Sequence, residues 1–234
     1  MREEEPKIGR YEPEGGIYVV GDEDKTARQN EELWDSRAET YDTRYSFTHW
    51  TQRKLVSLLQ LGDNPCLLDL GCGTGWTLRY AANRWQGEFY GVDISSKMVE
   101  RAQAKSRSYG NLHFYKSRVE ELPFDDDFFD VVISSYAFHH FSNPEKALRE
   151  ANRVLKPKGK LYILDMTANN AFTRLVDRFA RKLEAAHVKS YSTKEFQALF
   201  ERAGLRYITS KRIIPPIEVQ IAERHQGRAK ERGS

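Results

Sequence analysis

The chain has 234 residues, a length that fits one large domain with short appendages. Its 37 Lys and Arg residues and 34 Asp and Glu residues give a net charge of +3, and 39% hydrophobic residues are enough for a sizeable core. The two cysteines, Cys66 and Cys72, match neither a zinc motif nor a disulfide framework, and we expect no metal site. No apolar run approaches the roughly 18 residues of a membrane span, so we expect a soluble, cytoplasmic protein.

The charges are unevenly distributed along the chain. Residues 1–40 carry a net charge of −6, whereas residues 142–234 carry +10. A basic region of this kind attracts an acidic substrate, an anionic membrane surface or RNA, although a solvated basic surface is the simpler explanation. Neither a zinc-finger spacing nor an aromatic strand for stacking bases accompanies the charge, so no nucleic-acid partner is expected.

The two ends of the chain are poor in apolar residues. Residues 1–33 are predicted to form a polar N-terminal extension, loose up to about residue 30, in which the apolar island Ile17–Val20 could dock as a flap. Residues 225–234 are predicted to form a flexible basic tail. The residues between them, 34–224, are predicted to form one domain.

Strands and helices alternate through this domain, as apolar runs and helical spacing follow each other. The predicted elements are, in chain order, strand Cys66–Leu70, helix Thr77–Trp85, strand Phe89–Val92, helix Ser95–Ser106, strand Leu112–Tyr115, strand Phe129–Ser134, a helix that opens with Asn143 and Pro144 and is stopped by Pro157 and Gly159, and strand Lys160–Leu164. This alternation is typical of a parallel sheet with crossover helices.

The last part of the domain departs from the alternation. An amphipathic helix with a basic face is predicted over Ala171–Ala186, and residues 170–191 are the natural substrate lid, although core packing explains the apolar stripe as well. A helix capped by Ser192 and stopped by Gly204 follows. Strand Leu205–Ile213 then turns into an alternating strand and closes an antiparallel hairpin. The whole predicts an α/β fold with a doubly wound, Rossmann-like sheet of seven mostly parallel strands and one antiparallel strand.

The turn after the first strand is rich in glycine. After Asp69, glycines stand at every second position, Gly71, Gly73 and Gly75, and allow the backbone to approach a ligand closely. A dinucleotide fingerprint requires another glycine where this chain has Trp76, and a Walker loop requires a lysine that is missing here. NAD and a nucleoside triphosphate are therefore disfavoured as ligands of this turn.

An acidic residue follows the second strand. Asp93 stands where a carboxylate can accept hydrogen bonds from both hydroxyls of a ribose. A nucleoside held by a glycine turn without a phosphate motif fits S-adenosylmethionine.

Four segments together resemble one family. The segments "LLDLGCGTG", "FYGVDIS", "ELPFDDDFFDVVISS" and "LREANRVLKPKGKLYILD" are similar, in order and spacing, to the motifs of class I S-adenosylmethionine-dependent methyltransferases, in the small-molecule group that includes the quinone C-methyltransferases. The resemblance covers about Trp34–Arg224 and implies the class I methyltransferase fold and S-adenosylmethionine as cofactor.

The resemblance also implies roles for single residues. Arg118 stands where the family often has an acid that reads the adenine amino group, a departure that leaves the backbone of Val119, with Ser117 or Glu120, to contact the ring. The other implied contacts are the methionine moiety with Asp69 and the turn Gly71, Cys72 and Gly73, the ribose with Asp93, the adenine with Ile94 and Met98, and the ammonium with the Ser134 carbonyl.

Candidate catalytic residues follow the fourth strand. Tyr136, His139 and His140 lie at the carboxyl edge of the predicted sheet, where an imidazole could take a proton from a phenol, enol or amine. Each histidine could instead only shape its loop. Tyr41 and Tyr45 could close over the cofactor or simply pack.

The sequence therefore predicts an S-adenosylmethionine-dependent methyltransferase that acts on a small-molecule acceptor, such as a lipophilic phenol or quinone. The alternatives are a regulatory module that binds S-adenosylmethionine without turnover, a nicotinamide oxidoreductase, and an RNA methyltransferase. The fourth strand ends in "SSYAFHH" rather than in the Asn/Asp-Pro-Pro-aromatic signature of many nucleic-acid and protein methyltransferases, which weakens the last. The sequence is compatible with peripheral contact with a membrane. It is also compatible with either a monomer or a homodimer.

Overall fold

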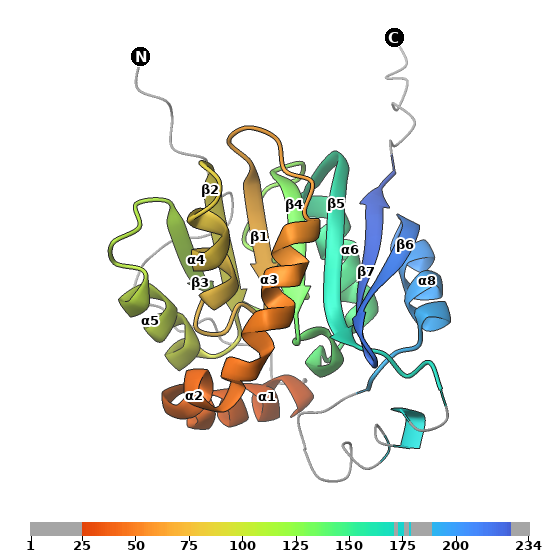
Figure 1. Cartoon of the computed structure of the whole chain (residues 1–234), viewed down its shortest axis with the longest axis horizontal. Helices are drawn as coiled ribbons and strands as arrows, with labels where there is room; N and C mark the ends of the chain where they lie inside the picture. Colours follow the sequence, from red (N-terminus) through yellow and green to blue (C-terminus); the bar gives the residue numbers. More distant parts are fainter. Residues whose placement is uncertain (1–24, 171–172, 176–177, 179–188, 226–234) are drawn as a thin grey trace.

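The computed structural model describes residues 25–170, 173–175, 178 and 189–225. These residues form a seven-stranded sheet with helices on both faces (Figure 1). The strands are β1 Cys66–Leu70, β2 Glu88–Asp93, β3 Leu112–Lys116, β4 Phe129–Ser135, β5 Leu155–Met166, β6 Leu205–Ile214 and β7 Ile217–Arg224.

The strands lie in the order β3-β2-β1-β4-β5-β7-β6. Strands β1 to β5 pair in parallel, whereas β7 runs antiparallel to both of its neighbours, β5 and β6. The predicted Rossmann-like sheet of seven strands with one reversed strand is confirmed. From β1 the chain moves outward to β3 and then returns to place β4 on the other side of β1, and ligands of such sheets bind beside that switch point.

The helices cover both faces and one end of the sheet. In Figure 1, α3, α4 and α5 lie in front of the strands, α6 and α8 lie behind them, and α1 and α2 cross the end toward which β1 and β4 point. Among the described residues, no helix has both the length and the apolar composition needed to cross a membrane. The helices are α1 Lys25–Arg37, α2 Tyr41–Tyr45, α3 His49–Leu58, α4 Trp76–Ala82, α5 Ser96–Lys105, α6 Pro144–Val154 and α8 Thr193–Arg202, with short 3₁₀ turns η1 Ala38–Thr40, η2 Ser46–Thr48 and η3 Phe138–His140.

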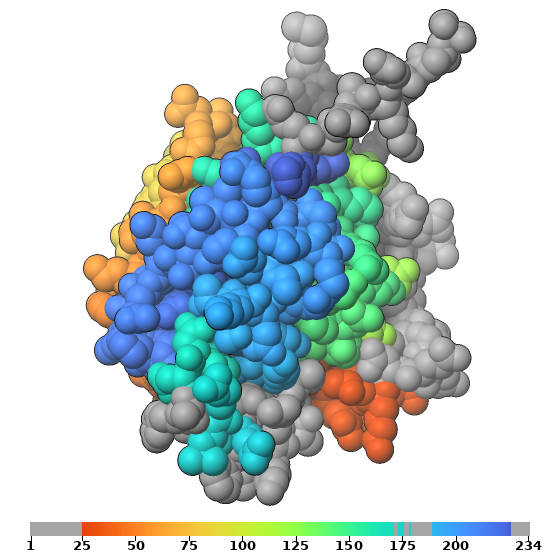
Figure 2. Space-filling model, turned by 90° about the vertical axis from the view of Figure 1, so that its right-hand side faces the viewer, coloured from red at the N-terminus to blue at the C-terminus, as the bar shows by residue number. Residues whose placement is uncertain are grey.

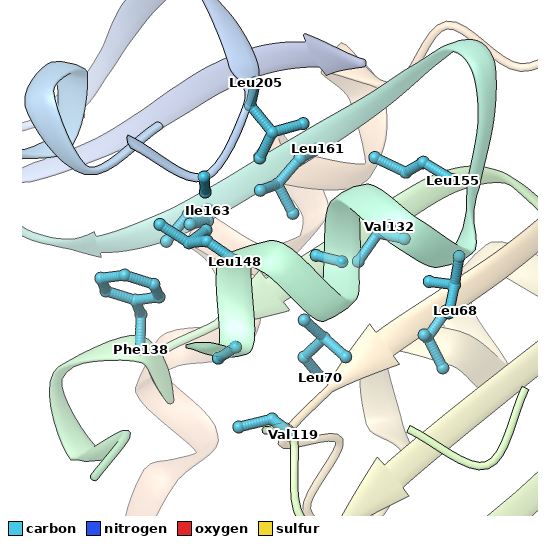
Figure 3. Close-up of a cluster of buried hydrophobic side chains, with 14 of the residues drawn as sticks. Leu68, Leu70, Val119, Val132, Phe138, Leu148, Leu155, Leu161, Ile163 and Leu205 are labelled. Atoms are coloured by element: carbon cyan, nitrogen blue, oxygen red, sulfur yellow. The ribbon is translucent and has the colours of Figure 1, made fainter. Parts of the chain in front are cut away.

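The central strands are buried on both faces, so successive residues contribute to two different cores. In β4, Val131 and Ile133 pack toward α3 and α4, whereas Val132 packs toward α6. Figure 3 shows the core around α6, in which Leu148 of the helix packs with Val132 of β4 and Leu161 of β5. This is why the dense apolar run of the fourth strand is a reliable indicator of a central parallel strand.

Two element boundaries differ from the prediction. The helix that begins at Pro144 ends at Val154, and β5 starts with the next residue. Pro157 and Gly159, which are expected to stop the helix, lie instead in the first half of β5. The strand tolerates this proline because that half of β5 pairs with β4 only at Leu155 and again from Lys160 onward.

The N-terminal region is more ordered than its composition suggests. The predicted boundary at residue 33 falls inside α1, which packs against α5. The expected flap at 17–20 lies outside the described residues, as do all of the basic tail beyond residue 225 and most of the predicted lid at 170–191. Within the lid, residues 173–175 are helical.

Candidate active site

The glycine turn joins β1 to α4 at the carboxyl end of the parallel strands. Gly71 and Gly73 have φ angles of +73° and +52°, a region that favours glycine over residues with a side chain. A Cβ on Gly71 would lie 2.5 Å from the Cβ of Ala137, and one on Gly73 would lie 3.4 Å from the ring of Tyr41. The glycines therefore let the turn pass close to both β4 and the N-terminal helices.

Asp93 ends β2 and faces this turn. Its two carboxylate oxygens accept hydrogen bonds from the backbone N–H groups of Gly73, at 2.8 Å, and Ser95, at 3.0 Å. Burial raises the pKa of Asp93 to about 6, although these two backbone N–H groups favour the charged form. Asp93 thus holds the glycine turn in place, and each oxygen keeps a second lone pair that can accept from a ligand.

Asp69 lies within β1, two residues before Gly71, and is almost completely buried. Within the part of the chain that the structure describes, neither of its carboxylate oxygens has a hydrogen-bond partner. Burial, together with the nearby charge of Asp93, raises the pKa of Asp69 to about 8. An unpaired carboxyl group in this position destabilises the fold unless a cation approaches it.

A cavity of about 640 Å³, counted to its open mouth, lies between the glycine turn and α1. Its lining residues are Ala27, Asn30, Trp34, Tyr41, Gly71, Gly73, Asp93, Ile94, Met98, Ser117, Arg118, Val119, Glu120, Tyr136, Ala137, His140, Phe141 and Ser142.

Helix α1 forms the roof of this cavity. The side-chain N–H of Asn30 donates to the backbone carbonyl of His140 at 2.7 Å, and the ring of Trp34 meets the His140 ring edge-on at a centroid distance of 5.0 Å. Asp35 accepts a hydrogen bond from the hydroxyl of Ser95 at 2.5 Å, which joins the roof to the start of α5. These roof residues are absent from the sequence-based prediction, although Ala27, Asn30 and Trp34 recur at helical spacing.

The end of the cavity next to β4 carries the predicted catalytic residues Tyr136 and His140. Tyr136 has a φ of +55°, and its hydroxyl is 2.7 Å from the Thr51 hydroxyl at the start of α3. Burial raises the pKa of Tyr136 to about 12, so this phenol is neutral at physiological pH. A residue held in the left-handed region next to a cavity indicates a position that its surroundings fix firmly.

The other predicted histidine, His139, is not among the residues that line the cavity. Its Nδ1–H donates to Asp165, with Nδ1 2.8 Å from Oδ1, and its backbone N–H donates to Oδ2 at 3.1 Å. A carboxylate only accepts, so this pair places the ring proton on Nδ1. The rings of His139 and His140 lie 3.9 Å apart. Asp165 therefore fixes His139, which in turn packs against the histidine that lines the cavity.

The part of the cavity lining formed by Arg118, Glu120 and Ser142 is polar. Glu120 accepts hydrogen bonds from the hydroxyl of Ser142, at 2.7 Å, and from the backbone N–H of Asn143, at 3.0 Å. Arg118 also donates to the Ser142 hydroxyl. Arg118 and Glu120 thus hold the loop before α6 as well as lining the cavity.

The structure brings most of the predicted cofactor-site residues together. Three of them, Asp69, Cys72 and Ser134, are buried beside the cavity rather than in its lining, and the Ser134 hydroxyl donates to the backbone carbonyl of Leu70. The predicted residues in the lining are Gly71, Gly73, Asp93, Ile94, Met98, Val119 and Glu120.

Comparisons with known proteins identify the family. Residues 68–163 match the family model described as a methyltransferase domain. The chain is 34% identical over 183 residues to the methyltransferase YcgJ of Bacillus subtilis, an alignment that covers 76% of this chain and 72% of that protein. The chain belongs to the S-adenosylmethionine-dependent methyltransferases.

Two further comparisons agree with this family and with the fold. The chain is 31% identical over 177 residues to the demethylmenaquinone methyltransferase of Bacillus licheniformis, in an alignment that covers 66% of this chain and 76% of that protein. Its fold is similar to that of a Haloferax volcanii protein that was solved in complex with the methyltransferase activator Trm112, with a TM-score of 0.72 and 22% identity; the match covers 82% of this chain and 97% of that one.

The residues of this methyltransferase fit its cofactor. S-Adenosylmethionine is a nucleoside with two cationic groups, a sulfonium and an ammonium. The cavity offers a carboxylate at the end of β2, apolar walls from Ile94 and Met98, and the unpaired buried carboxyl group of Asp69 beneath the glycine turn. The last feature is the one that a cation would satisfy.

Proposed function

We propose that this methyltransferase transfers the methyl group to a lipophilic small molecule with a phenol or quinol hydroxyl. The observation that carries the proposal is the composition of the cavity lining, in which Trp34, Tyr136 and Phe141 occur together with His140, and the Trp34 ring meets the His140 imidazole edge-on. Such a lining provides apolar contact area for a flat acceptor and one group that can take a proton. The demethylmenaquinone methyltransferases among the relatives support this class of acceptor.

The cofactor lies, in this proposal, between the glycine turn and α1. Asp93 accepts from the ribose hydroxyls, Ile94 and Met98 enclose the adenine, and the backbone of Val119 bonds its edge, with Glu120 or Ser117 beside it. The charge of Asp69 attracts the cationic amino-acid end over Gly71 and Gly73, and the Ser134 carbonyl is the further candidate for the ammonium. When bound, S-adenosylmethionine supplies an activated methyl group on sulfur.

His140 is the proposed general base. It takes the proton of the acceptor hydroxyl, which leaves an electron pair on the oxygen or, by delocalisation, on the neighbouring ring carbon. His139 and Asp165 are positioning residues, since the buried pair holds one imidazole firmly against the other. Tyr136, fixed by Thr51, provides a neutral hydroxyl in the same lining. The roof formed by α1 excludes water from the reacting groups.

The test is methyl transfer from tritium-labelled S-adenosylmethionine to a panel of acceptors. The panel contains a prenylated naphthoquinol, a simple lipophilic phenol, a primary amine and a transfer RNA, and product identity is read by mass spectrometry. We expect transfer to the quinol or the phenol, and strong loss of the maximal rate in His140→Ala with unchanged affinity for S-adenosylhomocysteine. Transfer only to the amine or the RNA, or full activity of His140→Ala, would overturn the proposal.

A second variant separates positioning from general damage. Asp165→Asn keeps the size of the side chain but removes its charge, so it weakens the hold on His139. We expect a shifted pH profile of the maximal rate with little change in the Michaelis constant for the acceptor. A pH profile identical to that of the wild type would show that the pair plays no part in the reaction.

A further inference from the structure

We propose that the end of the molecule that carries the cavity is an interfacial surface that binds anionic phospholipid membranes. The proposal extends the proposed function, since a lipophilic acceptor dissolves in a membrane. It is carried by a separate set of residues, named here the carboxyl-end patch and consisting of Phe47, Trp50, Leu175 and Ile214. Its test contains no acceptor, so its failure and the failure of the proposed function are distinguishable.

Exposed apolar side chains gather at this end. Among the described residues, five large hydrophobic side chains are exposed, and four of them form the carboxyl-end patch, with exposed fractions of 72% for Phe47, 51% for Trp50, 51% for Leu175 and 48% for Ile214. Single exposed hydrophobic residues are common on any protein surface, but their concentration at one end is not. The fifth, Ile208, is 39% exposed in the middle of β6.

Contacts within the fold place these residues at the same end of the sheet. Phe47 and Trp50 belong to η2 and the start of α3, which is tied to the end of β4 by a hydrogen bond from the side-chain N–H of Gln52 to the Ser135 hydroxyl. Ile214 ends β6, beside the turn whose carbonyl at Pro216 accepts from the N–H of the residue after β5.

The segment that carries Leu175 follows β5 at the same end. In Figure 1 the helical piece at 173–175 lies below the sheet, on the level of α1 and α2. Figure 2 shows the same piece, in cyan, protruding at the lower end of the molecule beside the blue strands. The carboxyl-end patch therefore borders the end at which the cavity lies.

The segments that carry Phe47, Trp50 and Ile214 are rich in basic residues, whereas α1, η1 and α2, at the same end of the sheet, carry acidic residues. Residues 43–62 contain three basic and no acidic residues, and Lys211 and Arg212 come just before Ile214, with Arg212 in an ion pair with Glu218. The ammonium of Lys54 lies 5.8 Å from the centre of the Trp50 ring, so a cation and an apolar aromatic side chain share one exposed site. Exposed basic residues near a membrane are attracted to the negative potential of anionic lipids.

The combination favours a lipid surface over a nucleic acid. Tryptophan and phenylalanine next to lysine and arginine are typical of segments that insert into the headgroup region. The aliphatic side chains of Leu175 and Ile214 neither stack on bases nor donate hydrogen bonds, but they lose contact with water when they enter a membrane. RNA binding would use the cations and leave these side chains without a role.

The experiment is co-sedimentation of the full chain with sucrose-loaded vesicles. One set contains phosphatidylcholine alone and the other contains 30% phosphatidylglycerol. The test variant is Phe47→Ala/Trp50→Ala, and the matched control is Ile208→Ala, which also removes an exposed apolar side chain, but away from the carboxyl-end patch. Two further single variants, Lys54→Glu and Lys158→Glu, reverse one charge each. The first lies at this end of the sheet, and the second lies at the opposite end of β5. The affinity of each variant for S-adenosylhomocysteine verifies its fold.

We expect the wild type to bind the anionic vesicles and to be released by 0.5 M salt. The double variant should lower the partition coefficient at least about tenfold, since two large apolar side chains no longer leave water. Lys54→Glu should weaken binding, whereas Ile208→Ala and Lys158→Glu should not. Absence of binding to both vesicle types, equal loss in the control variants, or binding of transfer RNA in place of vesicles would overturn the proposal.

Discussion

Asp69→Asn tests the interpretation of the unpaired buried carboxyl group. Asparagine has nearly the same shape, but it stays neutral at every pH. In the wild type without ligand, the pKa of Asp69 is raised to about 8 by burial, so the group remains largely protonated at neutral pH. A cationic ligand above the glycine turn favours the charged form, so binding must release this proton at any pH below about 8.

The sign and the size of the effect follow from this linkage. As the pH rises toward 8, the proton of Asp69 is released more easily. The dissociation constant of S-adenosylhomocysteine should therefore fall by up to about tenfold for each unit of pH increase, and it should level off above pH 8. The pH range from 6.5 to 7.5 isolates Asp69, because burial raises the pKa of Asp93 only to about 6. The folding stability of the protein without ligand has the opposite pH dependence. Because the pKa of Asp69 is higher in the folded state than in the unfolded state, this stability falls as the pH rises from about 4 to about 8.

The assay is isothermal titration calorimetry in phosphate and in Tris, two buffers with different ionisation enthalpies. The difference in apparent binding enthalpy counts the protons released. We expect close to one proton per site at pH 6.5 for the wild type and none for Asp69→Asn, whose affinity should not change between pH 6.5 and 7.5. A wild-type affinity that is independent of pH, with no proton release, would refute the assignment of Asp69 as the group that attracts the cation.

Three further predictions concern the fold. Gly71→Ala should destabilise the protein by about 1–3 kcal/mol in urea unfolding, because a Cβ there would lie 2.5 Å from that of Ala137 at a φ of +73°, whereas Gly62→Ala, with open space around it, should change stability little. Ser192→Ala should cost about 1 kcal/mol because it removes the capping box at the start of α8; an unchanged urea midpoint would contradict this. Leu161→Ala should cost about 2–5 kcal/mol because the side chain is completely buried in the core around α6, and a loss below 1 kcal/mol would mean that this core is loosely packed.

The fold could be predicted from the sequence because its strands carry strong local signals. The run at Phe129–Ser135 is apolar at nearly every position, as expected for a strand that contributes to two cores at once. The reversal of β7 follows from the turn at Pro215 and Pro216 between two alternating segments. Asp93 is predictable as well, because its role depends on its place at the end of a strand.

The roof and the histidine pair could not be predicted in the same way. Helix α1 is polar almost throughout and buries only Ala27 and Asn30, so its composition resembles that of a loose extension. The contact between His139 and Asp165 joins the ends of two adjacent strands, 26 residues apart in the chain. Local sequence patterns predict where the strands end, but they do not predict which side chains meet at those ends. The contact between His139 and Asp165 decides which of the two histidines lines the cavity.

The affinities of the wild type, Asp93→Ala and Glu88→Ala for S-adenosylhomocysteine decide whether the cavity beneath α1 binds the cofactor. Both substitutions remove a carboxylate from β2, but Asp93 lies at its carboxyl end in the cavity and Glu88 lies exposed at its other end. We expect tight binding by the wild type and by Glu88→Ala, and an affinity lowered about 100-fold in Asp93→Ala, since two hydrogen bonds to a charged group are lost. Equal affinity of all three proteins, or no binding by the wild type, would show that the cavity beneath α1 is not the cofactor site.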